Sequence, residues 1–324
     1  MYEIPDELAG GPFTLSRAAE LGIPARVLDG ARFARPWPGL RVLREHPDTL
    51  LERCRAVALI LPPSAVFSHA TALHLGGWDM PWQPERRRLR YSSHEPAPGT
   101  AIHVSVPAGT ARPHGKGIVG HAFTPLEEDI IQREGLQITS PWRTWCDLAA
   151  TSAAEVDLVI LADALRRRDQ RATAYLAQRL EDWGCGRGVR VLRRALALSR
   201  DRVDSAMETR LRLLFADAGL PDPEVNQCVR LPDGTGIHCP DLSWPRWRVA
   251  ADYDGRHHFD RDDEEDVRLG RASDWRQRTD NTRRDQLDDI NWTLRVFTSF
   301  DVYRRPEASA ERMRTVLRRA GAPF

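Results

Sequence analysis

The segment IHCPDLSWPRWRVAADYDGRHH, residues 237–258, contains two apolar stretches that each adjoin acidic side chains. Residues 237–242 form the first stretch and residues 247–253 form the second. Pro245 lies between them at a position typical of a turn. The composition of the two stretches therefore predicts a pair of β-strands with a short connection.

Three aspartates lie at the ends of these predicted strands. Asp252 and Asp254 share one face of their strand, whereas Val249 and Ala251 face the other side, because side chains alternate along a strand. If the two strands pair, Asp241 comes close to both aspartates. Burying such a group without a partner is costly, and a hard divalent cation with oxygen ligands removes the cost. The residues therefore predict a Mg²⁺ or Mn²⁺ site.

The flanking sequence extends this pair into a domain over residues 205–324. A capping box, Ser205-x-x-Glu208, starts an amphipathic helix that Gly219 ends. The expected elements are a helix over 205–218, strands over 225–231, 237–242 and 247–253, a helix over 274–290, a strand over 293–297 and a helix over 308–320. Their order is αβββαβα.

Residues 1–60 predict a small winged helix. Thr14 can cap a helix that Gly22 ends, and a second short helix follows Pro24. Residues 33–43 place proline and glycine between apolar residues, which suits a short β-wing. A helix, a turn, a helix and a strand pair, in this order, outline a winged helix.

Two further regions complete the expected α+β multi-domain fold. Residues 61–150 predict a mixed α/β domain, because residues 101–106 alternate as a strand does and Ser140 opens a helix. Residues 151–204 predict a helical connector, because apolar side chains recur at helical spacing over residues 156–165.

The composition limits the class of protein. The 324 residues, 41% of them hydrophobic, can bury a core, and a net charge of +1 means that any nucleic-acid surface is local. The five cysteines are scattered without a C-x-x-C pair, which argues against a zinc site or a disulfide framework. No signal peptide or bilayer-spanning apolar stretch is visible. We therefore expect a cytoplasmic protein with no membrane partner.

The acidic motif resembles the core of the PD-(D/E)XK nuclease superfamily, and in particular its Vsr-like (very-short-patch-repair) branch. Asp241 and the stretch VAADYDGRHH, residues 249–258, match a D-(F/L) pair followed by E-x-D-G-x-x-H. The stretch DNTRRDQLDDINWTLR, residues 280–295, matches the D-x-x-R-x-x-x-L-x-x-x-G-W pattern of that branch, and Glu208 matches its early helical glutamate. The resemblance implies a restriction-endonuclease-like domain that hydrolyses phosphodiester bonds, in DNA, with Mg²⁺ or Mn²⁺.

The resemblance also implies which residues act in this domain. The metal ligands would be Asp241, Asp252 and Asp254, with Glu208 completing the shell, His258 assisting proton transfer and Arg283 contacting the phosphate. Two departures stand against this assignment. Asp252 replaces the usual glutamate and is one methylene shorter, and a misplacement of about an ångström can cost on the order of 10²-fold in rate. Asp254 occupies the superfamily's lysine position, and Lys116 is the only lysine in the chain.

The N-terminal half resembles AbiEi-type antitoxins of type IV toxin–antitoxin systems. The similarity rests on residues 14–22, the wing at residues 38–40, residues 68–72 and the stretch TSPWRTWCDL, residues 139–148. It implies a winged helix that binds promoter DNA and a second domain that opposes a toxin or serves another defence-system partner.

Several of these residues also have simple structural explanations. Glu208 can bind the amide of Ser205 as a cap, with or without a catalytic role. Asp280 and Arg283 can form a surface ion pair. Arg143 and Asp147, one turn apart, are expected to form an internal salt bridge.

Two hypotheses about function follow. The first is a metal-dependent endodeoxyribonuclease with a DNA-binding N-terminal half, acting in phage defence, toxin–antitoxin biology or repair. The alternative is an AbiEi-like transcriptional regulator or antitoxin whose nuclease fold is inactive, because Asp252 replaces glutamate and residues 260–266 are acidic. A third hypothesis, a toxin-binding protein without nucleic-acid contact, rests only on the small net charge.

Overall fold

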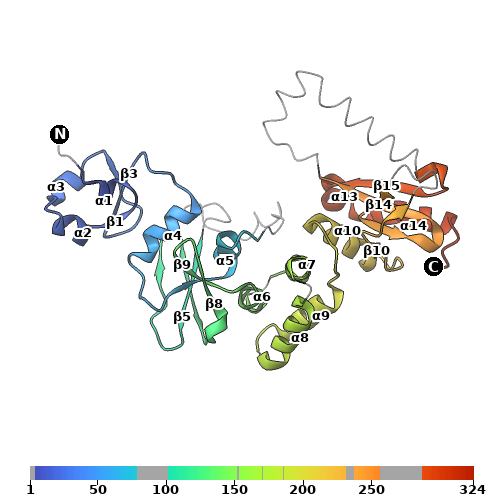
Figure 1. Cartoon of the computed structure of the whole chain (residues 1–324), viewed down its shortest axis with the longest axis horizontal. Coiled ribbons are helices and arrows are strands. Elements are labelled where there is room, and N and C mark those ends of the chain that lie inside the picture. The colour runs from blue at the N-terminus through green and yellow to red at the C-terminus, as the bar shows by residue number, and fades with distance from the viewer. Residues whose placement is uncertain are drawn as a thin grey trace, which may run out of the picture. The chain divides into compact units, whose positions relative to one another are not determined.

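The computed structural model describes residues 4–78, 101–151, 153–169, 171–184, 186–230, 237–255 and 287–324. The chain divides into two compact units, Met1–Ser152 and Ala153–Phe324. Both units combine helices with β-sheet, so the predicted α+β class is confirmed (Figure 1). In the part of the chain that the structure describes, no helix is both long enough and apolar enough to span a membrane.

The first unit begins with a small helical and β-sheet subdomain. Its elements are α1 (Asp6–Ala9), β1 (Phe13–Thr14), α2 (Leu15–Glu20), α3 (Ala25–Leu28), β2 (Phe33–Ala34) and β3 (Leu40–Leu43). The strands form an antiparallel sheet in the order β1-β3-β2. The Thr14 hydroxyl accepts a hydrogen bond from the Arg17 amide at 3.1 Å, so the predicted cap of α2 is confirmed.

The rest of the first unit is built round a six-stranded mixed sheet. The sheet order is β6 (His114–Gly115), β7 (Ile118–Phe123), β5 (Ile102–Pro107), β4 (Val66–Phe67), β9 (Leu136–Thr139) and β8 (Ile130–Arg133). The helices are α4 (Leu50–Ala58), α5 (His69–Leu75) and α6 (Pro141–Ala150), with a short 3-10 turn at Glu127–Asp129. β7 pairs parallel to β5, and β9 pairs parallel to β4.

A buried ion group anchors α6 in this unit. Arg143 Nε donates to Asp147 Oδ1 at 2.9 Å, and Arg143 Nη1 donates to Asp129 Oδ2 at 2.9 Å. All three side chains are buried. The predicted internal salt bridge between Arg143 and Asp147 is therefore confirmed, and Asp129 is a second partner that the helical spacing did not indicate.

The second unit starts with four helices, and buried ion pairs connect the first of them to the last. They are α7 (Glu155–Arg168), α8 (Ala172–Trp183), α9 (Val189–Leu198) and α10 (Ala206–Asp217). Arg210 of α10 contacts Asp157 of α7 at 2.7 Å, and Arg212 contacts Asp163 at 3.0 Å. Charges so deeply buried are tolerated only when they are paired and hydrogen-bonded. These two pairs therefore set how α10 lies against α7.

A four-stranded mixed sheet follows α10. Its order is β10 (Glu224–Val225), β13 (Leu242–Trp244), β14 (Val249–Asp254) and β15 (Thr293–Thr298). The first two pairings are antiparallel, and β14 and β15 are parallel. Two helices, α13 (Ser299–Arg304) and α14 (Pro306–Arg319), close the unit. The helix α13 was not expected from the sequence.

The expected strands over 225–231 and 237–242 are each broken into two parts. β10 pairs with β13, while β11 (Val229–Arg230) and β12 (Ile237–His238) form a separate ribbon. Asn226, with a φ of 47°, turns the first strand out of the sheet, and Pro240 has no N–H to donate in the second. Continuous strands were therefore a wrong prediction.

This ribbon also places two cysteines side by side. Val229 lies opposite His238, which puts Cys228 opposite Cys239, and the two sulfurs form a disulfide. The sequence argument against a disulfide was wrong for this pair, because a hairpin register brings together cysteines that look unrelated in sequence. Cys54 and Cys146 are buried free thiols in the first unit.

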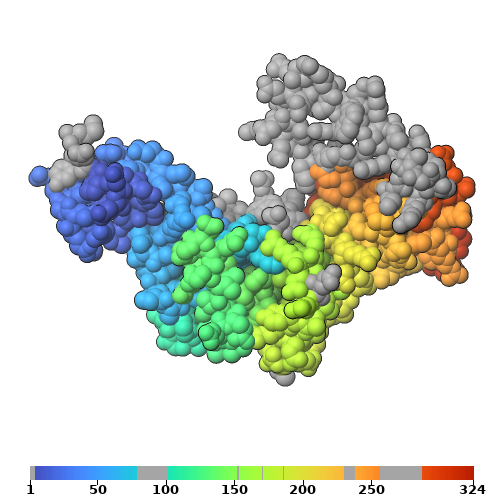
Figure 2. All heavy atoms as spheres, in the orientation of Figure 1, coloured from blue at the N-terminus to red at the C-terminus, as the bar shows by residue number. Residues whose placement is uncertain are grey.

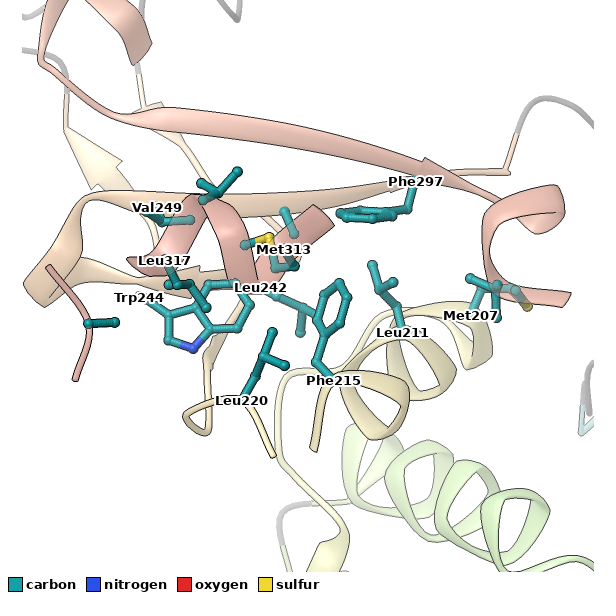
Figure 3. Packing of buried hydrophobic residues seen from close by; sticks show 14 residues of the cluster. Met207, Leu211, Phe215, Leu220, Leu242, Trp244, Val249, Phe297, Met313 and Leu317 are labelled. Carbon is teal, nitrogen blue, oxygen red and sulfur yellow. The ribbon is translucent and has the colours of Figure 1, made fainter. Parts of the chain in front are cut away.

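The core of the second unit lies between the sheet and its helices. α10 contributes Met207, Leu211 and Phe215, and the sheet contributes Trp244, Val249 and Phe297 to the same cluster (Figure 3). Val249 and Ala251 face this core, while Ala250 packs in a second cluster with Leu287, Trp292 and Leu294. The predicted alternation along β14 is thus confirmed. Figure 2 shows the atoms of the first unit in blue to green and those of the four-stranded sheet of the second unit in yellow to red.

Candidate functional site

Backbone hydrogen bonds between β13 and β14 hold two of the predicted acidic residues together. Leu242 pairs with Ala251, so Asp241 and Asp252 lie opposite each other at the next position. The Asp241 amide donates to Asp252 Oδ1 at 3.1 Å. In return, the Tyr253 amide donates to Asp241 Oδ2 at 2.6 Å. Each carboxylate is thereby oriented by the backbone of the opposite strand.

Glu208 joins this pair from the first turn of α10. The Glu208 amide donates to Ser205 Oγ at 3.2 Å, which confirms Ser205 as the N-cap. The Glu208 carboxylate does not reach back to the Ser205 amide as a capping box requires. Its Oε2 accepts from the Asp204 amide and from Asn226 Nδ2, each at 2.9 Å. The predicted bond from Glu208 to the Ser205 amide was therefore wrong, and the carboxylate accepts the Asp204 amide instead.

Burial and nearby charges raise the proton affinity of Asp241, and burial raises that of Glu208. Burial is the largest cause that raises the pKa of Asp241 to about 7, and the charges of Glu208, Asp252 and Asp204 raise it further against the Tyr253 hydrogen bond. Burial also raises the pKa of Glu208, although its hydrogen bonds from Asp204, Ser205 and Asn226 oppose this. Carboxylates with such raised pKa values are typical of functional sites.

One oxygen of the Asp241 carboxylate remains available to a ligand. Asp241 Oδ2 binds the Tyr253 N–H group, whereas Asp241 Oδ1 accepts no hydrogen bond from any residue that the structure describes. Oxygens of this kind suit a hard cation such as Mg²⁺, which keeps several of its waters. The ligand atoms of Glu208, Asp241 and Asp252 do not all lie within 4.8 Å of one another. Joint binding of one ion therefore requires side-chain rotation or a bridging water.

His238 is a neighbour of the acidic group that the sequence argument missed. Its Nε2 lies 3.5 Å from Asp252 Oδ2, and this nitrogen is buried without a hydrogen-bond partner. The only signal in the sequence was its position three residues before Asp241, in the broken strand. The sequence also carried no sign that Asn226 belongs to this site, because its side-chain amide reaches Glu208 only through the left-handed backbone at Asn226.

Of the other predicted site residues, the structure describes only Asp254. Asp254 ends β14 and is partly exposed, two residues beyond Asp252. His258 and Arg283 lie outside the residues that the structure describes, as does most of the helix expected over 274–290. The acidic group defined by the structure consists of Glu208, Asp241 and Asp252, with His238 and Asn226 beside it.

Comparison with known proteins gives no functional name to this arrangement. No family model matches the chain. It is similar to uncharacterized protein Rv2248 of Mycobacterium tuberculosis strain H37Rv and to uncharacterized protein MT2308 of strain CDC 1551. Each is 28% identical over 287 residues, which cover 88% of this chain and 93% of the relative. Because neither unit is 287 residues long, the similarity extends over both units.

Proposed function

We propose that the second unit is a metal-dependent endonuclease domain that hydrolyses phosphodiester bonds in DNA. The observation that carries this proposal is the cross-strand pair of Asp241 and Asp252, whose carboxylates each accept an amide from the opposite strand. Glu208 lies close enough to raise the pKa of Asp241. The mixed sheet behind α10, with β15 parallel to β14, agrees with the element order that the Vsr-like resemblance implies.

Each residue of the site has its own role in the proposed reaction. Asp241 and Asp252 would hold Mg²⁺ or Mn²⁺, with Asp254 and Glu208 completing the shell directly or through water. When bound, such an ion polarises a phosphoryl oxygen and lowers the pKa of a coordinated water. His238, 3.5 Å from Asp252, can accept or return a proton at Nε2. His258 and Arg283 keep the roles in proton transfer and phosphate binding that the resemblance implies.

Residues 1–60 are proposed to supply DNA affinity. The order α1, β1, α2, α3, β2, β3, with a three-stranded antiparallel sheet, fits the winged helix that the AbiEi-like resemblance implies. Binding by such a domain depends on phosphate contacts and weakens steeply as salt increases. A toxin or another defence-system protein is the partner that the same resemblance suggests.

One structural observation favours the alternative, a DNA-binding regulator with an inactive nuclease fold. Asp252 is shorter than the glutamate of the resembling branch, and the ligand atoms of the acidic group are not all within 4.8 Å of one another. In that case the purified protein binds DNA but does not cut it with Mg²⁺ or Mn²⁺.

Cleavage of plasmid DNA by the full-length protein, with Mg²⁺, Mn²⁺ or EDTA, separates the two proposals. We expect metal-dependent nicking that Asp241→Asn abolishes and that Asp217→Asn, an exposed aspartate on α10, leaves unchanged. Full activity in Asp241→Asn would exclude this centre. No cleavage by the wild type, with activity gained in Asp252→Glu, would show that the shorter side chain disables the site. No cleavage by any variant, on DNA that all of them bind, would support the regulator.

A further inference from the structure

Three histidines from separate segments meet on one side of the six-stranded sheet in the first unit. His103 is in β5, His121 is in β7, and His69 is the first residue of α5, directly after β4. Among the described residues, they form the only group of three or more His, Cys, Asp or Glu whose ligand atoms all lie within 4.8 Å of one another. Nothing in the sequence pattern placed His69, His103 and His121 together, because they belong to a helix and two strands that are separated along the chain.

The sheet register explains why the three side chains converge. In the parallel pairing of β5 and β7, His103 lies opposite Val119 and Ser105 lies opposite His121. His103 and His121 therefore lie on the same face of adjacent strands, offset by two residues along the strand direction. The Ser68 amide donates to the His103 carbonyl at 3.0 Å, which brings the next residue, His69, over this face.

The rings pack closely enough to share one small ligand. A hydrogen bond of 3.0 Å joins His103 Nδ1 and His121 Nε2, and a metal ion bound by both nitrogens would take the place of its proton. The rings of His69 and His121 stack with centroids 3.8 Å apart, and the other two pairs of ring centroids are 5.2 and 5.5 Å apart. Two imidazole nitrogens bound to one tetrahedral zinc are about 3.3 Å apart, given Zn–N bonds of about 2.05 Å. The nitrogen pair His103 Nδ1 and His121 Nε2 is thus already near that spacing.

A serine pair orients His69 in the way that metal-binding histidines usually require. Ser68 Oγ lies 2.9 Å from His69 Nδ1, and Ser105 Oγ donates to Ser68 Oγ at 2.8 Å. When His69 Nδ1 donates its proton to Ser68 Oγ, the lone pair of the ring lies on Nε2, which is then the ligand atom, as in metal-bound histidines with an outer hydrogen bond at the other nitrogen. His69 also has a φ of 53°, and a buried non-glycine residue held in this region marks a strained position.

The surroundings keep the rings in the uncharged form that has a lone pair. Burial, then the neighbouring histidines and Arg143, lower the pKa of His69 to about 2. Burial also lowers the pKa values of His103 and His121. Arg143 is itself paired with Asp129 and Asp147, so its charge is balanced locally. His103 and His121 are only partly buried, which gives an ion a path to the group.

We propose that His69, His103 and His121 form a binding site for a divalent transition-metal ion of the zinc class. Imidazole nitrogens select Zn²⁺ and its neighbours over Mg²⁺, which prefers oxygen. Three histidine ligands leave one coordination position open to water or to an exchangeable ligand. This site lies in the first unit and is independent of the acidic group in the second unit.

Zinc binding by the full-length protein tests the proposal directly. After dialysis against a chelator, the protein is titrated with Zn²⁺ in competition with a chromophoric chelator, and with Co²⁺ to record the visible absorption of a tetrahedral site. We expect one equivalent of Zn²⁺ that excess Mg²⁺ does not displace. In His121→Ala the affinity should fall at least about 10²-fold, the loss typical of damaged metal sites.

Matched variants separate this site from other histidines and from the acidic group. His74→Ala changes an exposed histidine on the same helix as His69 and should leave zinc affinity unchanged. Asp241→Asn should also leave it unchanged. His103→Gln, with a circular dichroism spectrum like that of the wild type, should lose zinc binding without loss of fold. An absence of zinc binding, or equal binding in His121→Ala and the wild type, would overturn the proposal.

Discussion

Replacing Asp241 by asparagine should stabilise the metal-free protein at alkaline pH. Asp241 is held against Glu208 and Asp252, and its pKa of about 7 lies well above its ordinary value of 3.8. A difference of about three pKa units corresponds to on the order of 4 kcal/mol. Asparagine keeps an oxygen that can accept the Tyr253 amide but removes the charge. The variant therefore avoids the cost of burying a charge, which is the largest cause of the raised pKa, and the repulsion from Glu208 and Asp252, while it keeps the Tyr253 hydrogen bond.

The sign of this effect depends on pH in a defined way. Below pH 3.8 the carboxyl group is protonated in both the folded and the unfolded protein, so its favourable contribution to stability is fully present. As the pH rises to about 7, the unfolded chain ionises first and the free energy of unfolding falls. Above that pH the loss is complete. The advantage of Asp241→Asn should therefore be about a third as large at pH 5 as at pH 8, where it is complete.

Thermal unfolding in EDTA at pH 5 and pH 8 measures this difference. Because Asp241 is partly exposed, we expect about 2–4 kcal/mol at pH 8, or roughly 5–10 °C in Tm for a unit of this size. Adding Mg²⁺ should raise the Tm of the wild type more than that of the variant, because only the wild type has a charged carboxylate at position 241 to bind the ion. A variant less stable than the wild type at pH 8, or with the same difference at both pH values, would refute the electrostatic explanation.

Two further predictions concern the stability of the second unit. Arg212→Met leaves the Asp163 carboxylate buried without its cation and should lower the free energy of unfolding by about 3–5 kcal/mol in urea titrations, whereas Arg319→Met, on the surface of α14, should change it little. If both variants unfold at the same urea concentration as the wild type, the buried pair does not stabilise the unit. The double replacement Cys228→Ser/Cys239→Ser removes a link across a separation of 11 residues and should cost up to about 3 kcal/mol without reductant. A wild type whose stability does not respond to dithiothreitol would contradict the disulfide.

Sequence reasoning succeeded where short-range chemistry decides the outcome. Thr14, Ser140 and Ser205 were assigned as helix caps, and each side chain accepts the amide three residues later. The pairing of the strands that carry Asp241 and Asp252 was also expected, because only a short turn at Pro245 separates them in the sequence. In each case the partners are a few residues apart or on consecutive strands.

The same reasoning failed where one residue redirected the backbone. The left-handed Asn226 and the proline at position 240 divide two expected strands, and the resulting ribbon positions His238 beside Asp252. A strand pattern is insensitive to such a break, because the apolar residues on either side still alternate. The hydrogen bond from the Asn226 side-chain amide to Glu208 was not expected either, because this amide reaches Glu208 only from the bent segment.

The sequence by itself determined the helix caps at Thr14, Ser140 and Ser205 and the two faces of β14, because these depend on side-chain periodicity and on hydrogen bonds within one turn. It also indicated which acids would share a strand end. Only the tertiary structure decided the ion pairs between α7 and α10 and the group of His69, His103 and His121. Those contacts join residues far apart in the chain, and their geometry depends on sheet register and on packing that no local pattern encodes.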